Sequence, residues 1–148
     1  DVDFSKAIIQ GPNNFGFDYF FGLGSSINHG PYSFVENNKI TEIPEKLRPE
    51  IKINRKAYRQ GWVAPSWKDD GQGEAISNAA LKFMKNHLKA NNKTPFFMYY
   101  AAVAPHWPWV PPESLAGIKI KGQGGTDDGN RSRNDMVFQN DVIIGRFL

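Results

Sequence analysis

The chain has 148 residues, of which 40% are hydrophobic and 22% charged, a composition typical of a globular protein and unlike that of a disordered segment. Its net charge is only +3, and its lysines and arginines do not form a single stripe, which argues against a nucleic-acid-binding protein. The sequence contains no cysteine, which excludes a disulfide framework, a zinc–thiolate site and a cysteine nucleophile within these residues. No apolar run approaches the roughly twenty residues of a membrane span.

The N-terminal part of the chain predicts a short buried element, a hairpin and then a long loop. An aromatic run with interspersed glycines at 15–26 indicates a buried element that leads into a tight loop. Two strand-like runs at 32–43 flank Asn37 and Asn38, residues that tolerate positive φ, so a hairpin is expected there. Residues 44–71 are rich in Pro, Lys, Arg and Trp without a sustained period, which favours a long surface excursion, a kind of segment that often carries substrate contacts.

The C-terminal part predicts a helix, a strand, a loop and a second helix. Apolar positions three and four apart predict the first helix over 73–90. The continuous apolar run 96–103 between Pro95 and Pro105 is typical of a central strand buried on both faces. A Pro- and Gly-rich loop at 104–129 then precedes a helical pattern that starts near Asn134. A helix followed by a buried strand is half of a crossover unit, so the predicted fold class is α/β.

Both ends of the sequence resemble cuts through a longer protein. The chain begins at Asp1 without an initiator methionine or a signal peptide. The last helical pattern runs to Leu148 without a stop signal. We therefore expect residues 1–148 to be one internal segment of a longer protein, truncated at both ends.

The segment after the predicted strand is the best candidate for chemistry. Ligands of open α/β sheets collect beyond the carboxyl ends of strands, where His106 lies. Pro105 and Pro108 restrict the backbone on either side of it. An imidazole held in this way can donate a hydrogen bond to an oxyanion or act as a general acid, whereas the alternative is a histidine packed against tryptophans without a role.

Three segments, in the right order, resemble the formylglycine-dependent sulfatase family of the alkaline phosphatase superfamily. The Ala-Pro-His-Trp-Pro sequence at 104–108 is similar to the strand-end segment that supplies the family's sulfate-binding histidine. The Gly-Phe-Asp sequence at 16–18 and the helical segment 140–146 resemble the segments before and after it. Together these matches cover nearly the whole chain.

The resemblance implies a fold and an activity. The fold would be part of an alkaline-phosphatase-like sandwich, with a central mixed sheet flanked by helices. The activity would be hydrolysis of sulfate esters through a formylglycine hydrate made from a Cys or Ser. A calcium ion (Ca2+) held by Asp and Asn side chains would neutralise charge on the sulfate oxygens, which is the kind of electrostatic help an anionic transition state needs.

The same resemblance implies roles for individual residues. His106 corresponds to the catalytic histidine that donates to the sulfate or to its leaving oxygen. Ser26 corresponds to a polar position that lines the sulfate pocket in some members. His29, in the same loop, is expected to contact sulfate or sugar, or else to hydrogen bond locally. Trp107 is a candidate for stacking on a sugar ring, as are Trp62, Trp67 and Trp109, although about half of these tryptophans are expected in the core.

The sequence departs from the family pattern in what it lacks. It contains no Cys/Ser-x-Pro-x-Arg motif and no assignable metal ligands, so the nucleophile and the calcium ligands are expected outside it and the segment alone is expected to be inactive. The acidic pairs Asp69-Asp70 and Asp127-Asp128 lack the spacing of a calcium loop and are interpreted as solvated carboxylates.

The predicted function is therefore that of a sulfuric ester hydrolase segment. The complete enzyme would act on a sulfated carbohydrate, glycan or aryl compound, and the partner of this segment would be the remainder of its own catalytic domain. A phosphodiesterase or phosphonate hydrolase of the same superfamily and a non-catalytic sugar-binding module are the alternatives. The family resemblance implies a periplasmic, extracellular or lysosomal location.

Overall fold

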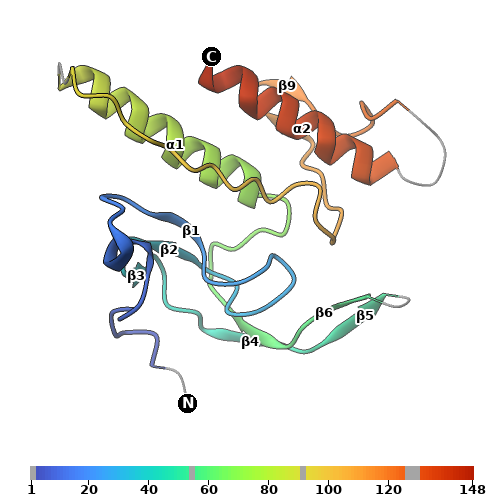
Figure 1. Cartoon of the computed structure of the whole chain (residues 1–148). Helices are drawn as coiled ribbons and strands as arrows, with labels where there is room; N and C mark the ends of the chain where they lie inside the picture. The colour runs from blue at the N-terminus through green and yellow to red at the C-terminus, as the bar shows by residue number, and fades with distance from the viewer. Residues whose placement is uncertain (1–2, 54–55, 91–92, 126–130) are drawn as a thin grey trace. The chain divides into compact units, whose positions relative to one another are not determined.

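The computed structural model describes residues 3–53, 56–90, 93–125 and 131–148, without the side chains of Ile53 and Arg131. The chain divides into two compact units, Asp1–Lys68 and Asp69–Leu148, and each is described by itself. The first unit contains short strands and one 3-10 helix, and the second contains two long helices and a small hairpin (Figure 1).

The first unit begins with a 3-10 helix and a three-stranded antiparallel sheet of order β1-β2-β3. These elements are η1 (Pro12–Phe15), β1 (Phe21–Leu23), β2 (Phe34–Glu36) and β3 (Lys39–Ile40). The predicted hairpin is confirmed: Asn37 adopts φ 54° in the turn between β2 and β3, which an asparagine tolerates. The buried element expected at 15–26 is shorter than expected, because β1 begins only at Phe21, and Phe15 is 77% exposed.

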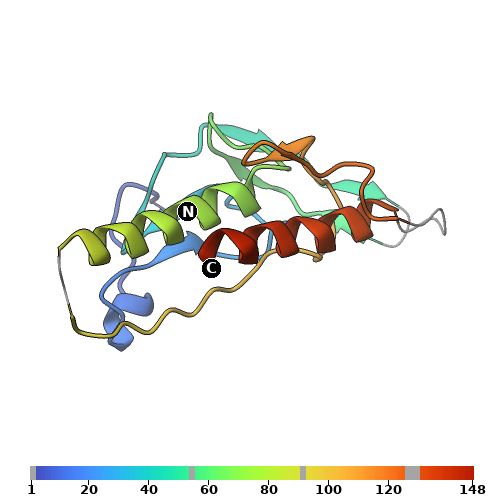
Figure 2. The same cartoon turned by 90° about the horizontal axis from the view of Figure 1, so that it is seen from above.

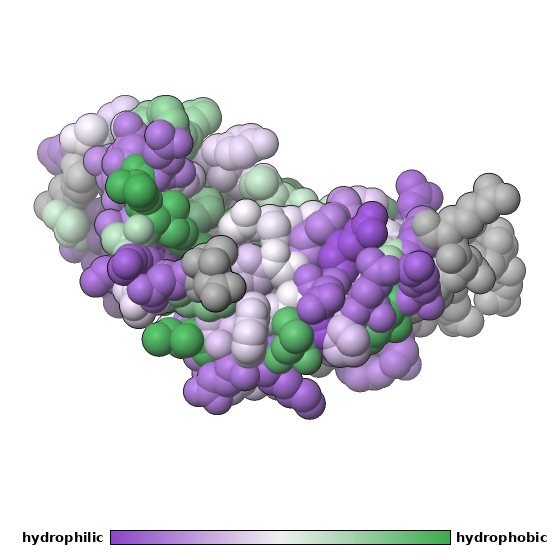
Figure 3. All heavy atoms as spheres, turned by 90° about the horizontal axis from the view of Figure 1, so that it is seen from below, coloured by the Kyte–Doolittle hydropathy of each residue, from purple (hydrophilic) through white to green (hydrophobic). Residues whose placement is uncertain are grey.

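Residues 44–71 were expected to be an irregular surface excursion without regular structure. This expectation was wrong, because most of the segment forms two antiparallel ribbons. The four strands are β4 (Lys46–Arg48), β5 (Ile51–Ile53), β6 (Lys56–Tyr58) and β7 (Gly61–Val63), paired as β4 with β7 and β5 with β6. Leu47 and Trp62 lie opposite each other in the register, and each is 45% exposed. Ribbons with apolar side chains left exposed lack the polar–apolar alternation that identifies a half-buried strand. Figure 3 shows one face of the molecule, where hydrophobic residues occur in small groups among hydrophilic ones.

An aromatic cluster forms the core of the first unit. Tyr32 is fully buried and contacts the ring of Trp67 edge-on, with ring centroids 5.8 Å apart. Phe34 bridges Trp67 and Phe21 at centroid distances of 5.4 and 5.3 Å. The guanidinium of Arg48 lies 4.5 Å from the centroid of the Tyr32 ring, a cation–π contact. Trp67 is half-buried and packs into this cluster, as expected of those tryptophans that belong to the core.

The second unit contains α1 (Gln72–Lys89), the hairpin β8 (Ser114–Leu115) and β9 (Ile118–Lys119), and α2 (Arg131–Phe147). The predicted first helix is confirmed as α1. The predicted second helix is also present as α2, and its Val137 and Ile144 are each 49% exposed. Its buried positions are Asp135, Met136, Gln139, Val142 and Ile143.

The core of this unit lies where α2 meets the hairpin. Leu115, Ile120, Val142 and Ile143 form it, and Tyr100, Phe138 and Phe147 pack against it. A Cβ added to Gly73 on α1 would lie 2.5 Å from Nε2 of Gln139, so the two helices approach closely at this glycine. Arg146 of α2 also donates hydrogen bonds to Oγ of Ser77 at 2.8 Å and to Oδ1 of Asn78 at 2.6 Å.

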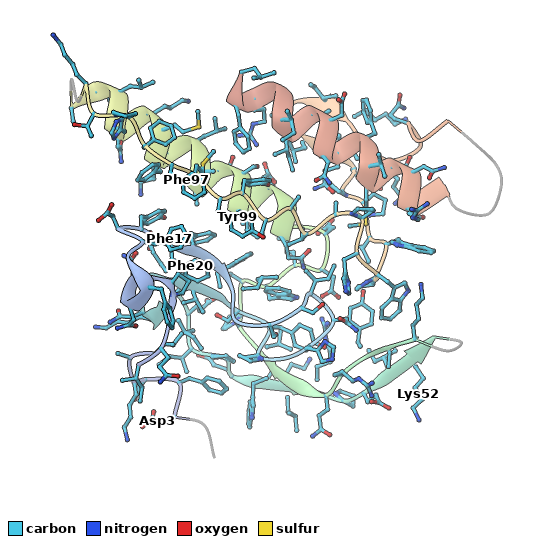
Figure 4. All side chains as sticks on the ribbon, viewed as in Figure 1. Asp3, Phe17, Phe20, Lys52, Phe97 and Tyr99 are labelled. Carbon is cyan, nitrogen blue, oxygen red and sulfur yellow. The ribbon has the colours of Figure 1, made fainter. Side chains whose placement is uncertain are left out.

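The predicted buried central strand at 96–103 is not formed within this chain. The segment is extended and runs back along α1, antiparallel to it, but no strand in the described part of the chain pairs with it (Figures 1 and 2). Phe97 and Tyr99, two positions apart, are 78% and 75% exposed, and their side chains project from the extended segment (Figure 4). A strand needs neighbouring strands for its backbone hydrogen bonds, and an apolar sequence alone does not supply them.

Candidate functional site

The loop that follows the extended segment places His106 at the surface. Ala104 is buried and anchors the start of the loop, whereas the side chain of His106 is exposed. The His106 backbone N–H donates to the Val103 carbonyl at 3.0 Å, which closes a tight turn. The sequence thus predicted correctly that this histidine lies in a loop after an extended run, although that run is not a paired strand here.

The backbone around His106 fixes its tautomer. Nδ1 of the ring lies in hydrogen-bonding contact with the backbone carbonyl of Trp107. A carbonyl oxygen can only accept a hydrogen bond, so Nδ1 must carry the proton. In the neutral ring Nε2 is then a hydrogen-bond acceptor, and in the imidazolium it is a second donor. This arrangement lets His106 donate to an oxyanion through Nε2 without losing the bond that orients the ring.

The side chains of Trp109 and Asn140 contact the backbone just before His106. Nε1 of Trp109 donates to the Pro105 carbonyl at 3.1 Å, and Trp107, two residues before Trp109, is half-buried. Nδ2 of Asn140, on α2, donates to the Ala104 carbonyl at 2.8 Å. Sequence reasoning did not find Asn140 as a site residue, because no local pattern links it to a carbonyl 36 positions earlier.

Ser26 and His29 lie together in a loop of the first unit, where both bind one amide oxygen. Oγ of Ser26 donates to Oδ1 of Asn28 at 2.9 Å, and Nδ1 of His29 lies 3.1 Å from the same oxygen. Nδ2 of Asn28 donates to the Ala57 carbonyl at 3.0 Å, which fixes the orientation of the amide. Ser26 is half-buried and His29 is exposed. Asn28 organises this loop and was not identified from the sequence.

The predicted site residues therefore form two pairs, each within its own unit. Ser26 and His29 share the amide of Asn28, and His106 and Trp107 share the hydrogen bond that fixes the imidazole. The local hydrogen bond expected as the alternative for His29 is present, and a substrate role for it stays a prediction. His87 lies on α1, where its Nε2 contacts the Thr94 carbonyl at 2.8 Å and its ring packs on Phe96.

The described residues do not fit the calcium ion that the family resemblance implies. Among residues 3–53, 56–90, 93–125 and 131–148, no three His, Cys, Asp or Glu side chains gather in a way that could hold a metal. Asp69 and Asp70 are half-buried, and Asp127 and Asp128 lie outside the described residues. Asp135, the most buried acidic side chain described, accepts hydrogen bonds from the backbone N–H groups of Gly122 and Gly124 at 2.8 and 2.6 Å and so serves the loop.

Two tyrosines with raised pKa values lie outside both loops. Burial raises the pKa of Tyr100 to about 12, although the nearby charge of Arg146 opposes the shift. Burial, together with the hydrogen bond to Glu36, raises the pKa of Tyr19 to about 12. Both phenols therefore stay protonated near neutral pH, and neither is suited to act as a base there.

In the part of the chain that is described, no helix has the length and apolar character of a membrane span.

Comparison with known proteins agrees with the resemblance seen in the sequence. The family model described as Sulfatase matches residues 4–148. An N-acetylgalactosamine-6-O-sulfatase of Bacteroides thetaiotaomicron is 27% identical over 180 aligned residues, which cover 99% of this chain and 33% of that protein. The chain thus spans about a third of the length of this curated relative.

A solved structure shares the fold. It is a Bacteroides thetaiotaomicron sulfatase studied in the metabolism of multiple glycosaminoglycans, it is 24% identical, and it superposes with a TM-score of 0.71 over 98% of this chain and 34% of its own. The predicted α/β class, as part of an alkaline-phosphatase-like fold, is confirmed by this likeness. Because the family model covers nearly all of these residues, the chain belongs to the sulfatase family.

Proposed function

We propose that this chain is a segment of the catalytic domain of a sulfatase that hydrolyses sulfate esters of a carbohydrate, with His106 as its catalytic histidine. The observation that carries the proposal is the exposed His106 imidazole, whose Nδ1–H is held by the Trp107 carbonyl at the end of an extended segment. Membership of the sulfatase family supports the reaction class, and the named relative supports a sulfated amino sugar as the first substrate to test.

His106 acts on the leaving oxygen. In its imidazolium form, Nε2–H points away from the Trp107 carbonyl and donates a hydrogen bond to the bridging oxygen of the ester. As the S–O bond breaks, that oxygen gains negative charge and takes the proton, so that the alcohol departs neutral and His106 becomes the neutral Nδ1–H tautomer. A proton donor placed in this way contributes roughly 10²–10⁴-fold to the rate.

Other parts of the reaction lie outside these residues. The sequence contains neither a cysteine nor a Ser-x-Pro-x-Arg motif, and the described residues hold no metal cluster. A formylglycine hydrate would supply the nucleophile, and a calcium ion would neutralise sulfate charge. We assign both to polypeptide beyond residues 1–148, which is the partner of this segment. Ser26 and His29 are proposed to line the sulfate pocket, and Trp107 is proposed to contact the sugar.

The test uses the complete gene product that carries this chain, matured so that formylglycine is formed. Hydrolysis of N-acetylgalactosamine 6-sulfate and p-nitrophenyl sulfate is compared with that of the matching phosphate esters. His106→Ala is expected to lower kcat on the sulfated sugar by about 10²-fold or more. The matched control is His87→Gln, because His87 packs on Phe96 away from the loop and its loss leaves kcat unchanged.

Three outcomes contradict the proposal. A clear preference for phosphate esters would indicate a phosphodiesterase or phosphonate hydrolase of the same superfamily. Glycan binding without turnover, lost in a Trp107→Ala variant, would indicate a sugar-binding module. Full activity of the folded His106→Ala variant would show that another group protonates the leaving oxygen.

A further inference from the structure

The backbone that leads into His106 is held by side chains at two consecutive carbonyls. The Ala104 carbonyl accepts a hydrogen bond from Asn140 at 2.8 Å, and the Pro105 carbonyl accepts one from Trp109 at 3.1 Å. His106 itself donates its backbone N–H to Val103 at 3.0 Å. Three successive residues of the loop are therefore fixed by hydrogen bonds that do not involve the imidazole.

Asn140 provides the hydrogen bond that ties this loop to a distant element. It lies on α2, whose neighbouring residues Gln139, Val142 and Ile143 are buried, so the helix is held firmly in its unit. The Ala104 carbonyl belongs to a residue that is only 6% exposed, and without its donor this polar group would be left buried and poorly paired. An aspartate at position 140 has the same shape, but its carboxylate has no N–H to donate.

The second contact comes from within the loop. Trp109 follows His106 by three residues, and its indole N–H reaches back to the Pro105 carbonyl. The Trp107 carbonyl between them orients the imidazole through Nδ1. The direction of Nε2 therefore depends on a short loop whose backbone is held by Asn140 at Ala104 and by Trp109 at Pro105, the two residues before His106.

We propose that Asn140 and Trp109 are positioning residues for His106, which hold the loop so that Nε2 meets the leaving oxygen of the sulfate ester. This inference rests on the proposed role of His106. The role proposed for the two side chains requires no contact with the reacting atoms. Their contribution is geometric, and displacement of a catalytic group by about 1 Å can cost on the order of 10²-fold in rate.

The test measures kcat and KM of the complete, formylglycine-containing enzyme with N-acetylgalactosamine 6-sulfate. Asn140→Asp is expected to lower kcat by about 10-fold or more while KM changes much less, because the loss affects the placement of the proton donor. Asn140→Gln keeps an amide donor on a longer side chain and is expected to recover part of the loss. Trp109→Phe keeps the ring but removes the N–H, and it should lower kcat in the same way.

Two controls separate positioning from general destabilisation. Asp141→Asn makes the reciprocal exchange at the exposed neighbouring position on α2 and should leave kcat unchanged. Ile143→Val weakens the core beside the same helix and should lower the melting temperature without lowering kcat at 25 °C. Melting curves show which variants are folded, and Trp109→Phe provides the test if Asn140→Asp does not fold.

The outcomes distinguish this inference from the proposed function. If His106→Ala loses turnover while the folded Asn140→Asp and Trp109→Phe variants keep wild-type kcat, the positioning role is overturned and the role of His106 stands. If a folded His106→Ala variant keeps wild-type kcat, the proposed function itself fails. If kcat falls to the same extent in Ile143→Val as in Asn140→Asp, the effect is one of stability, and the positioning role is again overturned.

Discussion

The hairpins of the first unit and the extended segment 96–103 of the second differ in where their hydrogen-bond partners lie. Strand β2 finds β1 and β3 nearby in the sequence, and β4 finds β7. Segment 96–103 consists entirely of hydrophobic residues, yet no described strand pairs with it, and Phe97 is 78% exposed. A strand is thus defined by its neighbours as much as by its sequence.

The share of the relatives that the chain covers suggests a reason for this difference. The chain spans 33% of the curated relative and 34% of the solved sulfatase. We propose that the partners of segment 96–103 belong to the rest of the catalytic domain, whereas the ribbons of the first unit are complete in themselves. The three predictions that follow test this contrast.

The largest effect is expected at Phe97. In the complete protein, partner strands would bury this side chain, so Phe97→Ala should reduce the free energy of unfolding by about 3–5 kcal/mol. Lys85→Ala, at an exposed charged position on α1, should change it by no more than about 0.5 kcal/mol. Chemical denaturation of the two variants measures the difference. A loss below about 1 kcal/mol for Phe97→Ala would mean that the segment stays exposed in the whole protein.

A smaller effect is expected where the first unit closes on itself. A Cβ added to Gly61 of β7 would lie 2.6 Å from Cα of Gly30 and 3.3 Å from the ring of Tyr32. Because the nearest atom is backbone, Gly61→Ala should force a shift and reduce the free energy of unfolding by about 1–3 kcal/mol.

The matched control for Gly61 is Gly24→Ala in the same unit. There the added Cβ would meet only Cγ2 of Val35, at an ordinary contact distance of 3.9 Å. Thermal or denaturant unfolding of both variants gives the comparison. Equal stability of Gly61→Ala and Gly24→Ala would show that the two glycines are not packed as the structure has them.

How far the fold could be predicted depended on the range of the contacts. Helix α1 and the hairpin at Asn37 follow from periodicity and turn chemistry within a few residues. The ribbon β4–β7 was missed because exposed strands show no alternation, and because its two strands are separated by the β5–β6 hairpin. The pairing of segment 96–103 was predicted from its own composition, which does not contain the information about its neighbours.

The candidate site shows the same dependence on range. His106 could be found because an apolar run and two prolines mark its position in the sequence. Asn28 and Asn140 could not, because they bind the carbonyls of Ala57 and Ala104, which are 29 and 36 positions away. An asparagine carries no local pattern that reveals such a partner, so residues that orient a site are harder to predict than those that face it.

The smallest effect is expected at an exposed contact that joins two parts of the first unit. Glu42 accepts hydrogen bonds from the hydroxyl of Ser66 and, at 2.9 Å, from its backbone N–H. These bonds, the hydroxyl first, lower the pKa of the Glu42 carboxyl below its ordinary value. A carboxyl whose pKa is lowered by folding stabilises the folded state above its unfolded pKa of about 4.3, and this contribution is lost as the pH falls below that value.

Glu42→Gln should therefore destabilise the protein slightly at pH 7 and have less effect at pH 3, which lies below the pKa of the unfolded carboxyl, so that part of the stabilisation is already lost. Glu45→Gln, at an exposed position three residues on, serves as the control for the loss of one negative charge. Unfolding measured at both pH values gives the difference between each variant and the wild type. If the difference for Glu42→Gln is the same at pH 7 and pH 3, the contact does not persist in solution. The closure of the first unit would then rest on its other contacts, among them its strand pairs and aromatic cluster.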